Sequence, residues 1–78
     1  MKNLCIVENH DYMDLYPFHT WEILEEQEES QYLECFKGWS GTVRIVDRTP
    51  ISNIEPLVQR WKLTDDVLND IKEAIRAL

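Results

Sequence analysis

The chain opens with a short apolar run. Residues 4–7 read Leu-Cys-Ile-Val and have a polar residue on each side. Branched apolar residues in a run of this length favour extended backbone, so we predict a buried strand over residues 3–7. Residues 9–18 have no steady period and contain two aspartates and Pro17. This composition predicts a loop or a single helical turn.

Residues 19–37 fit two different structures. As a helix, the segment begins at Thr20 as N-cap and ends at Gly38, a residue type that commonly follows a helix. The apolar face of that helix carries Trp21, Leu24, Tyr32, Cys35 and Phe36.

As a hairpin, residues 20–26 pair with residues 31–37 across an acidic turn at residues 27–30. Glutamate favours helices by intrinsic propensity, but Glu25 and Glu28 fall in the middle of the helical apolar stripe. We therefore expect the hairpin.

The next segment is the clearest strand of the chain. Glycines and a serine at residues 38–41 predict a turn, and residues 42–48 are rich in Thr, Val and Ile. This composition predicts a strand that follows the turn directly. Residues 47–52 contain Pro50 and are expected to form a loop.

Two helices are predicted after this loop. Ser52 and Glu55 have the spacing of a capping box, and Pro56 suits a first helical turn, so a short helix is expected to end near Lys62. Its inward residues are Leu57, Val58 and Trp61.

Thr64 is the predicted N-cap of the last helix, and Asp65 and Asp66 complement the dipole at its N-terminus. The apolar stripe of this helix consists of Val67, Leu68, Ile71, Ala74, Ile75 and Leu78. The pattern extends over more than three turns and has the helical period. We expect Trp61 and Ile71 to join the two helices to the sheet.

Together these elements predict one α+β domain over residues 1–78. A small antiparallel sheet of three to four strands is expected, covered on one face by the two C-terminal helices. A chain of 78 residues buries only about 60 to 65% of the surface that its unfolded form exposes. The core is therefore expected to be thin.

Acidic and basic residues are segregated along the chain. Residues 3–36 carry nine carboxylates and no Lys or Arg, whereas seven of the eight basic residues lie from Lys37 onward. Most of the net charge of −7 therefore belongs to the N-terminal half, which also holds six of the eight aromatic residues. Such a surface attracts cationic partners and repels nucleic acid.

The two cysteines, Cys5 and Cys35, are too few for the disulfide framework of a secreted scaffold. We expect both to be small hydrophobes buried in strands. The apolar run at residues 4–7 is much shorter than the apolar region of a secretory signal, and no stretch approaches membrane-spanning length. We therefore expect a cytoplasmic protein, in the host cytoplasm if a bacteriophage encodes it, with no membrane partner.

The side chains available as soft metal ligands are Cys5, His10, His19 and Cys35. They lack the close ligand pairs that structural zinc sites show. A hard-metal set of His10, Asp11 and Asp14 is no stronger, because three polar residues in a loop are usually solvated. No nucleophile elbow or phosphate loop is present. We expect no metal, no cofactor and no enzymatic activity.

The two C-terminal helices superficially suggest a helix-turn-helix. The first turns of the second helix would, however, present Asp65, Asp66, Asn69 and Asp70 to the nucleic acid. Duplex DNA carries about one negative charge per 1.7 Å of its axis and would repel this surface. We therefore expect no direct nucleic-acid binding.

Ten residues form the predicted partner-binding set: Asp11, Asp14, Glu22, Glu25, Glu26, Glu28, Glu29, Glu34, Tyr12 and Tyr16. Their carboxylates are expected to imitate phosphates. Residues two apart on a strand are spaced about 6.6 to 6.8 Å, and a DNA strand advances about 3.4 Å per nucleotide. Outward side chains such as Glu22 and Glu26 would then lie in rough register with a phosphate row.

Exposed rings among Tyr12, Tyr16, Phe18 and Tyr32 would add the anchors that charge lacks, because aromatic residues dominate interface hot spots. We expect the glutamates within residues 25–29 to lie outside the core, so that reversing their charge leaves the fold intact. The alternative interpretation is that the acidic half is only a solvated face that keeps the protein soluble.

These observations favour a non-enzymatic acidic inhibitor that docks on the basic nucleic-acid-binding surface of a larger effector as a DNA mimic. In size and charge the chain is similar to small acidic bacteriophage proteins that inhibit CRISPR or restriction effectors, although no motif supports the likeness. One alternative is a regulatory adaptor or antitoxin that pairs, with another chain or as a homodimer, through its C-terminal helices. A minor hydrolytic enzyme is the third.

Overall fold

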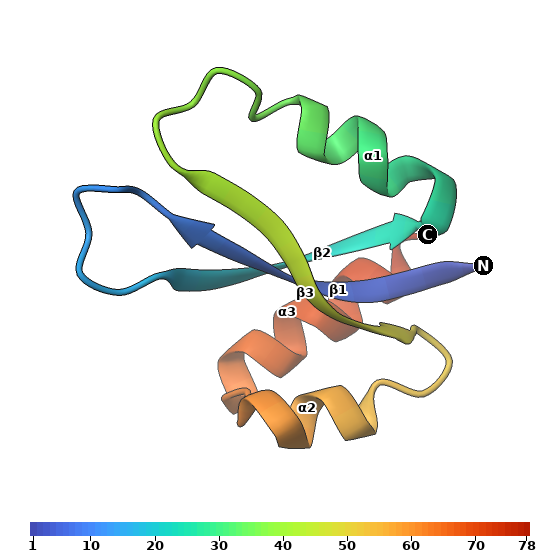
Figure 1. Ribbon diagram of the computed structural model, residues 1–78. Coiled ribbons are helices and arrows are strands. Elements are labelled where there is room, and N and C mark those ends of the chain that lie inside the picture. Colours follow the sequence, from blue (N-terminus) through green and yellow to red (C-terminus); the bar gives the residue numbers. More distant parts are fainter.

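The computed structural model describes all 78 residues and contains a three-stranded antiparallel sheet and three helices (Figure 1). The elements in chain order are β1 (Lys2–His10), β2 (Phe18–Glu25), α1 (Glu26–Glu34), β3 (Thr42–Pro50), α2 (Glu55–Trp61) and α3 (Asp65–Arg76). This arrangement confirms the predicted α+β class. None of the three helices has the length and apolar character needed to cross a membrane.

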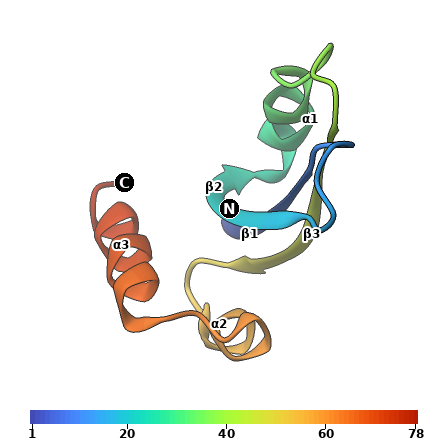
Figure 2. The same cartoon turned by 90° about the vertical axis from the view of Figure 1, so that its left-hand side faces the viewer.

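Strand β1 lies at the centre of the sheet, and the strand order is β2-β1-β3. Helices α2 and α3 lie on one side of the sheet and α1 on the other (Figures 1 and 2). The central strand is therefore covered on both faces, and the side chains of residues 4–7 are all buried. A continuous apolar run, without alternation, is the pattern that such a strand requires.

The main core lies between the sheet and the two C-terminal helices, as predicted. Leu4 and Ile6 of β1 pack there against Leu57 of α2 and Ile71 of α3, and all four side chains are buried. Trp61 is only partly buried, although it does pack against this cluster. The opposite face of β1 carries Cys5, which faces the α1 side of the sheet.

Residues 19–37 form neither the expected hairpin nor a single helix. The first part is β2, which pairs with β1 so that Trp21 lies opposite Ile6, and the second part is α1. Because β1 extends over nine residues, it provides an edge for β2, and a loop at residues 11–17 connects the two strands. Thr20 is consequently a strand residue and not a helix N-cap.

The two glutamates that interrupt the helical apolar stripe mark the start of α1. The carboxylate of Glu28 accepts a hydrogen bond from the backbone N–H of Glu25, with an N to Oε1 distance of 2.8 Å. This contact satisfies one of the backbone donors that a helix N-terminus leaves unpaired. Glu25 and Glu28, which argued against a helix over the whole of residues 19–37, therefore cap the shorter helix α1.

Strand β3 is longer than the sequence predicted and continues to Pro50. Residues 47–50 are thus strand and not loop, and Asp47 lies opposite Ile6 of β1. Pro50 is tolerated because it ends an edge strand, where no ladder donor is needed. The predicted turn before β3 is present, and a Cβ atom at Gly41 would lie 2.4 Å from the carbonyl oxygen of His10.

The C-terminal helices confirm one predicted cap and correct the other. The hydroxyl of Thr64 accepts a hydrogen bond from the backbone N–H of Val67, as expected. Helix α2 has Ile54 as its N-cap with no side-chain cap, so Ser52 does not form a capping box. It ends at Trp61, and its C-cap, Lys62, has a left-handed backbone with a φ of 50°.

Two further residues differ in burial from the sequence prediction. Cys35 is the C-cap of α1 and is exposed, whereas Cys5 is buried as expected. Leu78 lies beyond the end of α3 and is 64% exposed. It therefore does not extend the apolar stripe of α3 into the core.

Ile71→Ala should lower the free energy of unfolding by about 2 to 5 kcal/mol, because it opens a cavity in the main core. Chemical denaturation followed by circular dichroism measures this change. The matched control is Leu78→Ala, which removes an exposed apolar side chain from the same end of the chain and should change stability by about 0.5 kcal/mol or less. Equal losses for both variants would contradict the assignment of Ile71 to the core.

Candidate protein-binding surface

The ten residues of the predicted partner-binding set come from three parts of the fold. The loop between β1 and β2 carries Asp11, Tyr12, Asp14 and Tyr16. Strand β2 carries Glu22 and Glu25, and helix α1 carries Glu26, Glu28, Glu29 and Glu34. The loop and the start of α1 are at opposite ends of the sheet (Figure 1). The set does not form one continuous row.

The expected phosphate-like register is absent. It required Glu22 and Glu26 to lie on one strand, but Glu26 is the first residue of α1. Glu22 lies opposite Cys5 in the sheet and is partly buried. The spacing of these two carboxylates is therefore not that of alternate residues along a strand.

Cationic groups, most of them distant in sequence, neutralise much of the acidic half. The pairs are Lys2–Glu28 at 3.1 Å, Arg44–Glu8 at 3.0 Å, Arg48–Glu29 at 2.8 Å, Lys37–Glu34 at 4.0 Å and the N-terminal amine with Glu25 at 3.8 Å. The hydrogen bonds from the Glu25 backbone and from Lys2 lower the pKa of the Glu28 carboxyl. Five of the nine carboxylates in residues 3–36 thus have a cationic partner.

The contact between Glu29 and Arg48 joins two elements. Arg48 donates two hydrogen bonds to this carboxylate, from Nε at 3.1 Å and from a terminal nitrogen at 2.8 Å. Because Glu29 belongs to α1 and Arg48 to β3, the pair fixes the helix against the sheet. Reversing the charges at Glu25, Glu28 and Glu29 would disrupt the capping and pairing of α1, contrary to the expectation that these residues are structurally neutral.

The loop at residues 11–17 is the most apolar exposed part of the molecule. Tyr12, Met13, Leu15 and Tyr16 are 73%, 76%, 84% and 77% exposed. Phe18, the first residue of β2, is 52% exposed. Contiguous apolar exposure of this kind is unusual on a monomeric soluble protein and commonly marks an interaction site.

Trp39 belongs to the same end of the sheet. Its ring and the backbone of Asp11 both approach Gly41 so closely that a Cβ atom there would collide with them. The ring is 40% exposed. We call the six apolar residues of this surface the apolar tip: Tyr12, Met13, Leu15, Tyr16, Phe18 and Trp39.

The loop of the apolar tip is held by its own polar contacts. The Asp11 carboxylate accepts a hydrogen bond from the backbone N–H of Met13 at 3.0 Å, and its carbonyl accepts one from Asp14 at 2.9 Å. The ring Nε2 of His10 lies 3.2 Å from the carbonyl oxygen of Asp14. Neither aspartate forms an ion pair, so both charges remain available beside the exposed rings.

Sequence reasoning identified five residues of this region and missed the others. Tyr12, Tyr16 and Phe18 were predicted as exposed rings, together with the carboxylates of Asp11 and Asp14, but Met13 and Leu15 were not. The missing signal was available in the sequence: four large apolar residues occur within a five-residue stretch that has no helical or strand period. Trp39 is remote in sequence and is brought to the tip only by the turn before β3.

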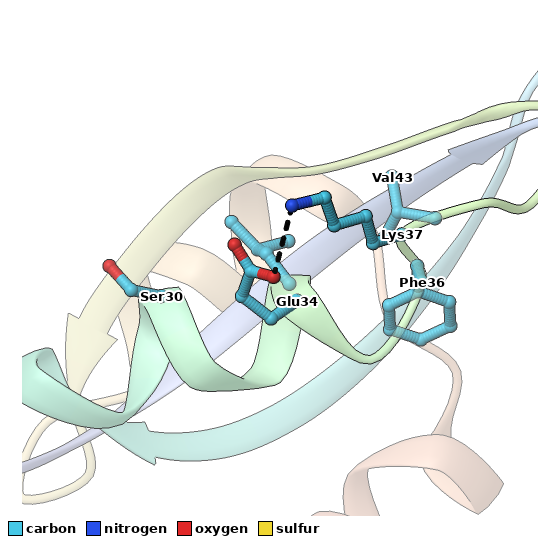
Figure 3. Close-up of a pocket in the computed structure, with 6 residues that line it drawn as sticks. Ser30, Glu34, Phe36, Lys37 and Val43 are labelled. Carbon is cyan, nitrogen blue, oxygen red and sulfur yellow. Dashed lines mark ion pairs between the residues drawn. The ribbon is translucent and has the colours of Figure 1, made fainter.

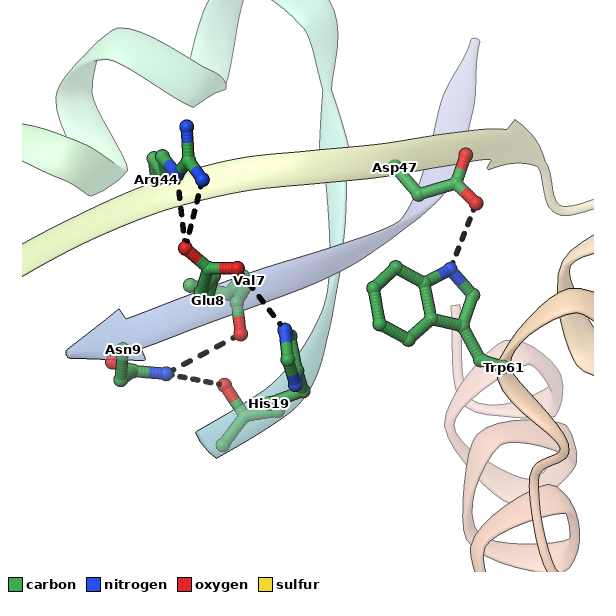
Figure 4. Close-up of polar contacts among 8 residues, drawn as sticks. Val7, Glu8, Asn9, His19, Arg44, Asp47 and Trp61 are labelled. Atoms are coloured by element: carbon green, nitrogen blue, oxygen red, sulfur yellow. Dashed lines mark hydrogen bonds and ion pairs between the residues drawn. The ribbon is translucent and has the colours of Figure 1, made fainter. Parts of the chain in front are cut away.

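A second polar arrangement lies on the α2 side of the sheet (Figure 4). The carboxylate of Glu8 accepts hydrogen bonds from Nε of Arg44 at 3.0 Å and from Nε2 of His19 at 3.3 Å. These contacts, Arg44 foremost, lower the pKa of Glu8. The His19 ring lies against Trp61 with a centroid distance of 4.8 Å.

Asp47 anchors the other side of this arrangement. Its carboxylate accepts a bidentate contact from Arg60 at 2.9 and 3.1 Å and a hydrogen bond from Nε1 of Trp61 at 2.8 Å. The backbone N–H of Arg48 is a further donor at 2.8 Å. These donors, above all Arg60, lower the pKa of Asp47. The group therefore stays ionised and holds α2 against β3.

The wide depression in Figure 3 lies between α1 and the start of β3 and has a volume of about 460 Å³. Its walls include Leu33, Phe36 and Val43, with Glu34 and Lys37 paired at its edge. No His or Cys lines it. It therefore offers neither an imidazole nor a thiol nucleophile.

No group of three or more His, Cys, Asp or Glu side chains is placed to hold a metal ion. Burial raises the pKa of Cys5 to about 11, so its thiol stays protonated at neutral pH. Cys35 lies at the exposed end of α1.

No protein-family model, curated protein or solved structure matches this chain at a significant level.

Asp47→Asn should lower the free energy of unfolding at neutral pH by about 1.5 to 3 kcal/mol, because a carboxylate accepts stronger hydrogen bonds from Arg60 and Trp61 than a neutral amide does. The effect should depend on pH. The folded-state pKa of Asp47 is lowered, so its contribution is present above the unfolded-state pKa of about 3.9. It is lost as the pH falls through the folded-state value.

Urea unfolding at a series of pH values from neutral to strongly acidic checks this expectation. The difference between the parent chain and Asp47→Asn should shrink as the medium becomes acidic. Asp14→Asn is the control, since Asp14 is exposed and has no ion-pair partner. A constant difference at all pH values would argue against an ionic role for Asp47.

Proposed function

We propose that this protein is a non-enzymatic, acidic protein-binding inhibitor that docks on the basic nucleic-acid-binding surface of a larger effector. The single observation that carries the proposal is the apolar tip beside unpaired carboxylates. In this proposal the tip makes the short-range contacts, and the negative charge directs the approach. Such an inhibitor acts by occupying the surface that nucleic acid would otherwise use, in the manner of bacteriophage anti-defence proteins.

The apolar tip supports protein binding because exposed apolar surface is costly to keep in water. Each fully buried large apolar side chain contributes about 1.5 to 3 kcal/mol relative to its exposed state. Tyrosine and tryptophan are also enriched among the residues that dominate binding free energy. Two tyrosines and Trp39 in one exposed surface provide these anchors.

The charge supports a basic partner, but through fewer carboxylates than the sequence suggested. Asp11 and Asp14 flank the exposed rings and have no cationic partner within the chain. Glu25, Glu28 and Glu29 act mainly within the fold, as caps or ion pairs. A net charge of −7 still accelerates encounter with a positively charged groove, and salt weakens that attraction.

The alternative adaptor function has less support. It requires an apolar patch on the outer face of α3, but that face carries Asp66, Asn69, Asp70, Lys72 and Glu73, all of them exposed. A polar helix face of this kind is typical of a solvated surface. A homodimer through the apolar tip is a separate possibility and is an outcome of the test below.

The enzyme alternative also lacks a complete site. His19 contacts Glu8, which is the pairing that acid–base catalysis often uses. The contacts from Arg44 and His19 lower the pKa of Glu8, which makes its carboxylate a weaker base. No Ser, Cys or Lys side chain is among the residues that line the adjacent cavity. The arrangement therefore serves better to position rings than to transfer protons.

The triple variant Tyr12→Ser, Leu15→Ser and Tyr16→Ser should lose partner binding while it keeps the fold, because the three side chains are exposed and lie outside the core. Affinity capture from a bacterial lysate with immobilised protein, at low salt and at several hundred millimolar salt, measures this loss. The parent should retain basic nucleic-acid-binding proteins at low salt and fewer of them at high salt. Each retained effector should then be tested for loss of nucleic-acid binding when the parent chain is added.

Leu78→Ser is the matched control, since it removes an exposed apolar side chain away from the tip. It should capture the same proteins as the parent. Identical capture by the triple variant would exclude the apolar tip as the interface. Capture that is insensitive to salt would exclude the electrostatic part of the proposal, and self-association that the triple variant abolishes would favour a homodimer.

A further inference from the structure

A separate cavity lies between the sheet and the C-terminal helices, and no residue of the apolar tip lines it. Its volume is about 300 Å³, and its lining consists of Ile6, His19, Thr20, Trp21, Trp61, Leu63 and Val67. Five of these seven residues are apolar. Small-molecule sites are typically apolar cavities of about 300 to 1,000 Å³ with a few polar groups. This cavity is at the lower end of that range, which suits a single small ring.

Two of the aromatic side chains that line the cavity, Trp61 and His19, are held in place by contacts with charged residues (Figure 4). Trp61 donates its indole N–H to Asp47 at 2.8 Å, and Arg60 in turn holds Asp47 in a bidentate contact. His19 contacts Glu8 at 3.3 Å, and Arg44 holds Glu8. Rings restrained in this way are less free to collapse into the cavity, which is how second-shell contacts preorganise a binding site.

The hydrogen bond between His19 and Glu8 determines which polar group a ligand needs. An ionised carboxylate only accepts hydrogen bonds, so Nε2 of His19 must carry the proton that it shares with Glu8. In the neutral imidazole the other nitrogen, Nδ1, is then an acceptor. A ligand that bonds to Nδ1 of the neutral His19 ring therefore supplies an O–H or N–H donor.

The net charge near the cavity favours a neutral ligand. Glu8 and Asp47 are each paired with an arginine, Arg44 and Arg60 respectively. No unpaired Lys, Arg, Asp or Glu is among the lining residues. We infer that this cavity binds a neutral, single aromatic ring that carries one hydrogen-bond donor, such as a phenol.

The inference does not depend on the proposed inhibitor function, because none of its residues belongs to the apolar tip. Two sources can supply a phenol ring: a free small molecule and a tyrosine side chain of another protein. The first is represented by p-cresol and the second by N-acetyl-tyrosinamide, which adds peptide groups on both sides of the side chain.

Titration with p-cresol, followed by the indole N–H signals of the three tryptophans in two-dimensional NMR spectra, tests the inference. Trp21 and Trp61 line the cavity, whereas Trp39 lies at the apolar tip and serves as an internal control. The Trp21 and Trp61 signals should shift and saturate, and the Trp39 signal should not. Shifts that do not saturate, or that are equal at all three rings, would overturn the proposed site.

The donor requirement is tested on the unmodified chain with 4-methylanisole, which has the same ring but no O–H. It should bind about fivefold more weakly than p-cresol, since a net hydrogen bond contributes about 1 kcal/mol. Equal affinity would overturn the role of His19. His19→Phe should reduce p-cresol affinity to that of 4-methylanisole, with the dispersion of the spectrum as the check on folding.

N-acetyl-tyrosinamide then distinguishes the two sources. Binding as tight as that of p-cresol supports a site for a protein side chain, because the peptide groups are tolerated at the cavity mouth. Binding of p-cresol alone supports a site for a free small molecule. Failure of both probes to shift Trp21 and Trp61 overturns the inference and leaves the inhibitor proposal untouched.

Discussion

The structure depends on one constraint, the burial of the central strand on both faces. Residues 4–7 of β1 are apolar without interruption and buried, so neither face of the strand can be left in water. Strands β2 and β3 satisfy its backbone on the two edges. The two C-terminal helices cover one face, and α1 covers the other. A chain of this size has little further apolar surface to bury, which explains why most residues outside this layer remain partly exposed.

Ion pairs between the two halves of the chain also stabilise the fold. Acidic residues of the N-terminal half meet basic residues of the C-terminal half because β3 lies directly beside β1 in the sheet. Arg44 and Arg48 of β3 reach Glu8 of β1 and Glu29 of α1 by this arrangement. The fold thereby reduces the self-repulsion that segregated charge would otherwise cause. Asp11 and Asp14, beside the apolar tip, are left without an ion-pair partner.

The aromatic residues divide in the same way between two surfaces. Tyr12, Tyr16 and Trp39 lie at one end of the sheet, and all three remain exposed. Trp21 and Trp61 line the cavity beneath the C-terminal helices. The first group suits contact with a large partner surface, and the second suits enclosure of one small ring. The two proposals therefore use different residues and can be tested independently.

The sequence by itself determined the α+β class, the buried strand at residues 3–7, the start of β3, and the N-cap and most of the apolar stripe of α3, because local periodicity and capping chemistry carry that information. It also identified Tyr12 and Tyr16 with their neighbouring aspartates. It did not determine the secondary structure of residues 19–37, because pairing with β1 outweighs local propensity. It also did not place Arg44 and Arg48 beside the acidic half. Ion pairs between distant residues, the position of Trp39 and the cavity between Trp21 and Trp61 arise from the packing of elements that are far apart in the chain. Only the tertiary structure decided them, since no local pattern records which edges and faces meet.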